Sequence, residues 1–253
     1  MKILTDIHMH TVASNHAYST VHDYWNFSID RGLQLFGLSD HAPDMPDGAH
    51  AWHFGNRKVL PRIYNNVAML RGIEANIQPP GGGIDIPHNM LPYLDYVIAS
   101  LHEPVFPPSS DRKANTTAVI NTIISGKCQV LGHLGNPNYP IFYEEVVRAA
   151  KDNNVVIEIN NSSFTHSRPG SKPNCVKLME LTEKLNWKVS FSSDSHSAFT
   201  VGEFATSIDV AKSIGFPESK IVNATAKRFL SFLAEHGKPV ASELKDWSEQ
   251  FSE

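Results

Sequence analysis

Short apolar runs alternate with longer amphipathic segments along most of the chain. Continuous apolar runs are typical of strands buried on both faces, as in a parallel sheet. Such runs predict seven strands, at 4–8, 35–39, 68–73, 96–101, 129–132, 155–159 and 188–192. The segments between and after them predict helices at 21–31, 115–125, 143–153, 174–185, 201–214 and 225–236. Strands joined by crossover helices indicate an α/β protein, either a barrel or an open doubly wound sheet.

Two proline-rich segments interrupt this alternation. The segment 42–61 is predicted to be a long ordered loop, and 78–92, with its Pro-Pro-Gly-Gly-Gly stretch, a loop or small hairpin. Strand-like runs resume directly after both segments, so neither is interpreted as a domain linker. We therefore expect one domain over residues 1–253, with a polar tail from Gly237 that frays or packs as a short helix.

The composition is that of a globular protein rather than a disordered chain or a protein that coats nucleic acid. Hydrophobic residues make up 41% of the chain and charged residues 19%, enough for a core. The net charge of −4 argues against a broad basic face for duplex nucleic acid. Two cysteines, Cys128 and Cys175, are too few for a disulfide framework or a four-cysteine zinc site. No run approaches the roughly 18 apolar residues of a membrane span, so we expect a cytoplasmic protein.

Histidine and carboxylate side chains follow six of the seven predicted strands. The carboxyl ends of parallel strands meet at one edge of an α/β barrel, where active sites are built. Imidazole and carboxylate ligands suit Zn²⁺, Mn²⁺ and Fe²⁺. A catalytic zinc uses about three protein ligands, so a larger set implies two or three metals that share a carboxylate. The nine candidate ligands are His8, His10, His16, His41, Glu74, His102, His133, Asp194 and His196.

The motifs that carry these residues resemble the PHP (polymerase and histidinol phosphatase) superfamily. They are Asp-Ile-His-Met-His-Thr at 6–11, Ser-Asp-His at 39–41, Gly-Ile-Glu at 72–74, His102, His133 and Ser-Asp-Ser-His at 193–196. Further stretches, among them Glu-Ile-Asn-Asn-Ser-Ser-Phe at 158–164, resemble the single-domain YcdX-type phosphatases of that superfamily. The resemblance implies a distorted (β/α)7 TIM-like barrel with three metals, usually zinc, at the carboxyl ends of its strands. It also hints at a trimer.

Carried over by position, the resemblance implies how the nine ligands divide among three metals. His8, His10, Glu74 and Asp194 would hold the first. Glu74 would bridge to a second metal, held also by His102 and His133, and the third would be bound by His16, His41 and His196. Three divalent ions beside two carboxylates would give a cationic pocket that favours a small phosphorylated substrate.

Several residues near these motifs are candidates for roles beyond metal binding. Asp40 could orient an imidazole or protonate a leaving oxygen. Arg168 follows the one strand without a metal ligand, and is interpreted either as a phosphate contact or as a solvated surface arginine. His50, His53 and His166 lie in loops that could overhang the site, whereas His22 and His236 are expected to be ordinary helix residues.

Three alternatives to a phosphatase follow from the same residues. An amidohydrolase-type enzyme also begins with His-x-His on its first strand, but the bridging lysine that it often carries after strand four is here replaced by Ser-Leu-His-Glu at 100–103. A phosphodiesterase or nuclease would use the same metals on a different ester. A non-enzymatic metal-binding module would have saturated metals with no open position.

Overall fold

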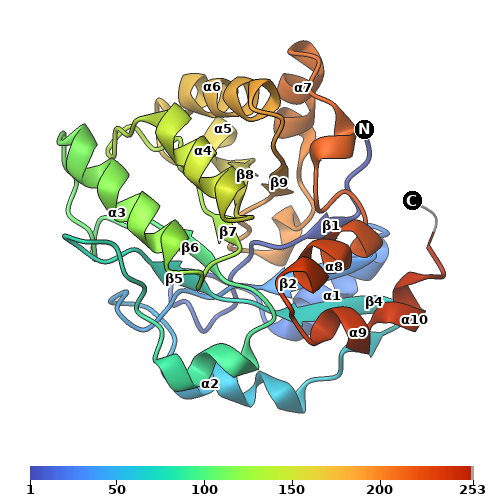
Figure 1. The fold of residues 1–253 in the computed structure, drawn as a ribbon. Helices are drawn as coiled ribbons and strands as arrows, with labels where there is room; N and C mark the ends of the chain where they lie inside the picture. Colours follow the sequence, from blue (N-terminus) through green and yellow to red (C-terminus); the bar gives the residue numbers. More distant parts are fainter. Residues whose placement is uncertain (252–253) are drawn as a thin grey trace.

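The computed structural model describes residues 1–251 and shows a mixed α/β fold with two largely parallel sheets (Figure 1). The first sheet has the order β1-β2-β4-β3 and the second the order β5-β6-β7-β8-β9; only the β3–β4 pair is antiparallel. The strands are β1 (Thr5–Asp6), β2 (Leu35–Leu38), β3 (Ile63–Tyr64), β4 (Val67–Arg71), β5 (Glu74–Asn76), β6 (Ile98–Ser100), β7 (Val130–Leu131), β8 (Val156–Asn160) and β9 (Val189–Ser192).

All seven predicted strands are confirmed, with one important refinement. The third run, predicted at 68–73, corresponds to β4. A further short strand, β5, was not predicted; it follows after Gly72 and Ile73, where the chain passes from the first sheet to the second. The short strand β3 was not predicted, because two residues are too few to show a strand pattern.

The predicted helices are confirmed, with shifts at their ends. The α-helices are α1 (Val21–Asp30), α2 (Ala51–Asn56), α3 (Arg112–Ile124), α4 (Tyr143–Asp152), α5 (Ser162–Thr165), α6 (Ser171–Lys184), α7 (Ala205–Ser213), α8 (Ala226–Glu235), α9 (Val240–Glu243) and α10 (Lys245–Ser248). Helix α3 begins early because the Asp111 side chain accepts a hydrogen bond from the amide of Ala114. Helix α7 begins late because a 3₁₀ turn (Ala198–Thr200) and Gly202, with φ of +72°, precede it.

The expectation of a continuous loop at 42–61 was wrong. Helix α2 forms there, followed by a 3₁₀ turn (Arg57–Val59), and the His50 side chain caps α2 by accepting a hydrogen bond from the amide of Trp52. The segment 78–92 contains part of another 3₁₀ helix (His88–Tyr93). The tail from Gly237 packs as helix, the second of the two expected alternatives, and forms two short helices, α9 and α10. Val240 and Leu244 of this tail are buried.

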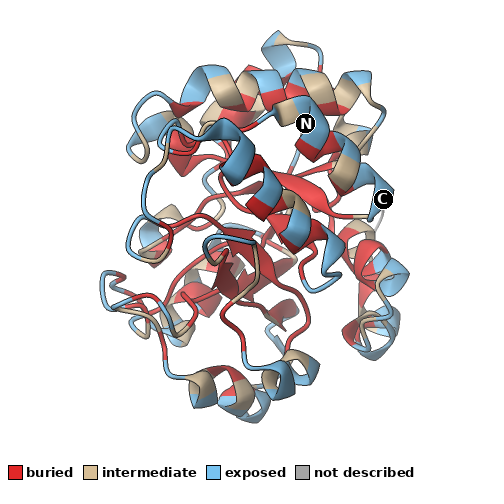
Figure 2. Ribbon diagram, turned by 60° about the vertical axis from the view of Figure 1, so that its left-hand side comes forward, coloured by how far each residue is buried: buried red, intermediate tan, exposed pale blue. Residues whose placement is uncertain are grey.

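The two sheets approach each other at two isolated parallel bridges. Met9, beyond β1, pairs with Ser195, beyond β9, and His41, beyond β2, pairs with Glu74 at the start of β5. Apart from the two exposed residues of β3, the strands are largely buried, whereas the helices expose one side to solvent (Figure 2). Helices α3 and α4 pack against the second sheet, α1 against the first, and α8 closes an apolar cluster that contains residues from strands of both sheets. Within residues 1–251, the helices are all too short or too polar to cross a membrane.

Candidate metal centre

The ends of β1, β2, β6, β7 and β9, together with the start of β5, bring the nine predicted ligand residues into one cluster. His8 and His10 project to the same side because side chains alternate along extended backbone. The cluster is largely buried: seven of the nine residues are less than 9% exposed, and only His16 and His196 are more accessible. The structure thus places side by side residues that lie up to 188 positions apart in the sequence.

Glu74 occupies the middle of this cluster. Its Oε1 lies 3.3 Å from His8 Nε2, 3.2 Å from His102 Nε2 and 2.9 Å from His133 Nε2. Its Oε2 lies 2.9 Å from His41 Nδ1 and 3.5 Å from His10 Nε2. One carboxylate therefore faces five imidazoles, a geometry suited to a carboxylate shared between neighbouring metals.

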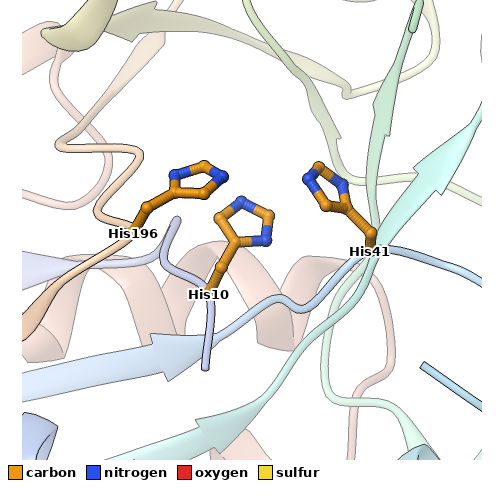
Figure 3. A group of neighbouring side chains, drawn as sticks. All are labelled: His10, His41 and His196. Carbon is orange, nitrogen blue, oxygen red and sulfur yellow. The ribbon is translucent and has the colours of Figure 1, made fainter. Parts of the chain in front are cut away.

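Three groups of side chains have ligand atoms within 4.8 Å of one another. They are His10 with His41 and His196, His8 with His10 and Asp194, and His41 with Glu74 and His102. In the first group, three rings from three separate strand ends point toward one another (Figure 3). His16 extends this group, because its Nε2 lies 2.8 Å from Nε2 of His196.

The donor atoms that face the middle of the cluster fit metal ions. Among the described residues, buried side-chain atoms without a hydrogen-bond partner include His8 Nε2, His10 Nε2, His41 Nδ1, His102 Nε2 and Glu74 Oε2. An unpaired polar atom in a protein interior is costly, so such atoms are rare and gather where a ligand completes them. Five of them in one cluster of imidazoles and a carboxylate are consistent with metal coordination.

The electrostatics of the site favour a neutral imidazole at His10 beside an ionised carboxylate at Glu74. Burial, with His41 and His196 close by, holds the pKa of His10 well below its usual value. Burial alone would raise the pKa of Glu74, but the surrounding imidazoles hold it well below the usual range. Neutral imidazole and ionised carboxylate are the protonation states that bind metals.

His8 lies in the most negative part of the site. Burial alone would lower its pKa, but Glu158, Glu74 and Asp194 together raise it well above the usual value. Three buried carboxylates around one ring create a negative potential that attracts a cation. Either a proton on the ring or a divalent ion bound beside it would compensate this negative charge.

Asp40 is buried away from the open part of the cluster. It accepts hydrogen bonds from the backbone and hydroxyl of Thr11 and from the hydroxyl of Ser14, and it is paired with Arg57 at 2.6 Å and with His53 at 2.9 Å. Burial would raise its pKa, but His53 and Arg57 lower it far below the usual range. A carboxylate held ionised in this way is a poor proton donor, which favours the orienting role over the acid role.

Arg168 lies beside the cluster and is not a solvated surface residue. Its Nη2 donates to Asp194 Oδ2 at 2.9 Å, and its side chain is 18% exposed. It lines a cleft of about 570 Å³ together with His16, His102, His166 and Asn161. Of the three loop histidines, His166 thus lines this cleft, His53 contacts Asp40, and His50 caps α2.

Three residues of this site have a backbone conformation that L-residues rarely adopt. The φ angles are +32° at His133, +56° at Asp194 and +51° at Arg168. Such conformations are costly, and they persist in proteins mainly where function requires a side chain in one place. The sequence carries only a weak signal for them, because Asp and His adopt positive φ more readily than most residues but far less readily than Gly.

The sequence interpretation missed the residues that hold the ligand rings from behind. Glu158 contacts His8 Nδ1, Asp47 contacts His16 Nδ1, and Asn76 contacts His102 Nδ1. For Glu158 a signal was present: a charged residue stands inside an otherwise apolar strand and alternates with Asn160, so both point to the same side.

Comparisons with known proteins agree with this geometry. The sequence model of the PHP domain family matches residues 6–162. The chain is 48% identical over 241 residues to a probable phosphatase of Enterobacter sp. (strain 638), covering 95% of this chain and 98% of that protein. It is 49% identical over 237 residues to a probable phosphatase of Shewanella frigidimarina, covering 94% and 95% of the two chains.

Among solved structures, the fold is similar to that of histidinol phosphate phosphatase from Lactococcus lactis, complexed with zinc, L-histidinol and phosphate. The TM-score is 0.62 at 16% identity, covering 84% of this chain and 94% of that chain. At this identity the similarity is one of fold.

Proposed function

Because the chain belongs to the PHP domain family, we propose that it is a metal-dependent phosphoric ester hydrolase acting on a small phosphomonoester. The observation that carries the proposal is the cluster of buried imidazole and carboxylate atoms that lack hydrogen-bond partners within the described chain. The names of the curated relatives, and the zinc and phosphate bound by the L. lactis phosphatase, support the same chemistry.

We further propose that the two sheets form one distorted (β/α)7 barrel. The third barrel strand would consist of β4 and β5, joined through Gly72 and Ile73. The bridges Met9–Ser195 and His41–Glu74 support closure on both sides. The apolar cluster below α8, which includes Leu35 from the first sheet and Val130 from the second, supports a shared interior.

The proposed centre holds about three metals, with zinc favoured by the imidazole-rich ligand set and manganese or iron as alternatives. His8, His10, Glu74 and Asp194 would hold the first metal; Glu74, His102 and His133 the second; and His16, His41 and His196 the third. The geometric groups support three adjacent sites, and the shared position of Glu74 supports its role as the bridge.

When bound, divalent ions would supply Lewis acidity to a phosphoryl group and to the attacking water. The chain's own residues would bind the phosphoryl group and position the metal ligands. The guanidinium of Arg168 faces the cleft, so it can donate to a phosphoryl oxygen while it remains paired with Asp194. Asp40 and Ser14 link the segment that carries His10 to the segment that carries His41, because the Ser14 hydroxyl donates to Asp40 and accepts from the amide of His41.

A panel of phosphomonoesters tests the proposal directly. Metal-stripped protein should be inactive, and zinc, manganese or iron should restore hydrolysis. In ¹⁸O-water the label should appear in the released phosphate, vanadate should inhibit competitively, and no phosphorylated protein should be trapped. A metal-loaded protein that ignores every phosphomonoester but cleaves amides or lactones would identify an amidohydrolase-type enzyme instead; cleavage of phosphodiesters alone would identify a phosphodiesterase or nuclease.

A further inference from the structure

We propose that Glu158 is a positioning residue that fixes the ligands of the buried part of the metal centre, although it contacts none of the metals itself. This inference rests on the proposed metal centre. Glu158 lies on β8, the strand that supplies none of the nine ligands, and its carboxylate is fully buried.

The two oxygens of Glu158 have separate partners. Oε1 lies 2.5 Å from Nδ1 of His8 and also accepts a hydrogen bond from the hydroxyl of Ser192. Oε2 accepts from the backbone amide of His133 at 2.7 Å and from the side-chain amide of Asn160 at 3.1 Å. All of these groups are buried, so water does not replace a partner that is lost.

The contact with Oε1 sets the tautomer of His8. A carboxylate can only accept, so the neutral ring must carry its proton on Nδ1. The lone pair of Nε2 is then left facing Glu74 and Asp194, at 3.3 and 3.5 Å, where it has no hydrogen-bond partner within the described residues. An imidazole held in this way by a carboxylate is both oriented and made more basic toward a metal.

The contacts with Oε2 extend this control to two other ligands. His133 has its unfavourable φ of +32°, and Glu158 holds its amide in place. Asn160 donates to Glu158 and also lies 3.1 Å from Asp194 Oδ2 as a donor. One carboxylate on β8 thus fixes ligand residues at the ends of β1, β7 and β9.

The substitution Glu158→Gln tests this role while keeping the size of the side chain. With its amide oxygen toward the His133 amide, the new side chain would turn its NH₂ group to Nδ1 of His8, which can accept only when the ring proton has moved to Nε2. Turned the other way, the NH₂ group would face the backbone amide of His133, and that hydrogen bond would be lost. We expect chelator competition to show a ~10–100-fold rise in the metal dissociation constant, the usual effect of losing such a partner. Nitrogen NMR of the imidazoles should also show that His8 no longer holds its proton on Nδ1.

Ile159→Val is the matched control. Ile159 is the next residue on β8, is fully buried, and faces away from the site toward Phe191 and Met179. It should lower stability while leaving the metal dissociation constants within about threefold of the parent protein, since it touches no ligand partner. If Glu158→Gln and Ile159→Val lose metal equally at the same stability, the inference is overturned.

Two further outcomes separate this inference from the proposed function. If the parent protein retains metals and folded Glu158→Gln protein binds them equally well, the proposed role of Glu158 is wrong, but the metal centre is not contradicted. A parent protein that takes up no metal overturns the centre itself.

If Glu158→Gln does not fold, Ser192→Ala carries the test, because it removes one donor to Oε1. It should weaken metal binding in the same direction, and unchanged binding would overturn the inference.

Discussion

At the scale of single residues, the site is built from ordinary side chains in unusual surroundings. A histidine at a strand end is commonplace, but here the Nε2 atoms of His8, His10 and His102 are buried without hydrogen-bond partners within the described residues. Arg168 is also an ordinary side chain in unusual surroundings. It lines the cleft from the loop between α5 and α6 and donates a hydrogen bond to Asp194. Its position in the lining of the cleft, beside Asp194, is the observation behind the proposed contact with an anionic group.

Replacing Arg168 with alanine should therefore raise KM by about tenfold, equivalent to ~1.4 kcal/mol, with a smaller fall in kcat. The reason is that a contact made to phosphate in both ground and transition states contributes mainly uniform binding. Steady-state kinetics on a phosphomonoester measures both constants. Arg148→Ala, which removes an exposed arginine paired with Glu144, is the control and should change neither. If Arg168→Ala also changes neither, the arginine does not contact the substrate.

At the scale of elements, the sequence predicts the strands well and their boundaries less well. Apolar runs identify seven strands because buried parallel strands need apolar side chains on both faces. They do not show that a second strand, β5, follows the third run after Gly72 and Ile73, because β4 and β5 are distinguished by pairing with different neighbours. Helix α2 was hidden by the prolines around it. The positive φ angles at His133 and Asp194 arise from tertiary contacts that no local pattern encodes.

The connection between β4 and β5 also requires a glycine, at position 72. A Cβ at Gly72 would lie 2.2 Å from Cζ of Tyr96, whose fully buried ring is anchored by a hydrogen bond from its hydroxyl to the carbonyl of Ile7. Gly72→Ala should therefore lower the free energy of unfolding by about 1–3 kcal/mol, the usual effect of overpacking a core. Urea denaturation provides the measurement. Gly81→Ala, where a Cβ would meet open space, should be close to neutral. Equal stability of the two variants would show that Tyr96 can move aside.

At the scale of the whole molecule, the fold brings together residues that the sequence keeps far apart. The prediction of a site at the carboxyl ends of the strands needed only the rule that parallel strands end at one edge. The second layer of residues, such as Glu158 and Asn76, required the structure, because a buried polar side chain in a strand does not reveal its partner. The same layer explains why the centre can be rigid although its ligands come from loops and strand ends.

The central claim is that nine side chains form one centre for several metals, and metal content tests it most directly. Protein purified without chelator should contain about three divalent ions per chain by elemental analysis, and dialysis against a chelator should remove them together with phosphatase activity. The expectation follows from the number of ligand atoms that converge on Glu74 and Asp194. A reproducible content of one ion or fewer per chain, in protein never exposed to chelator, would contradict the account.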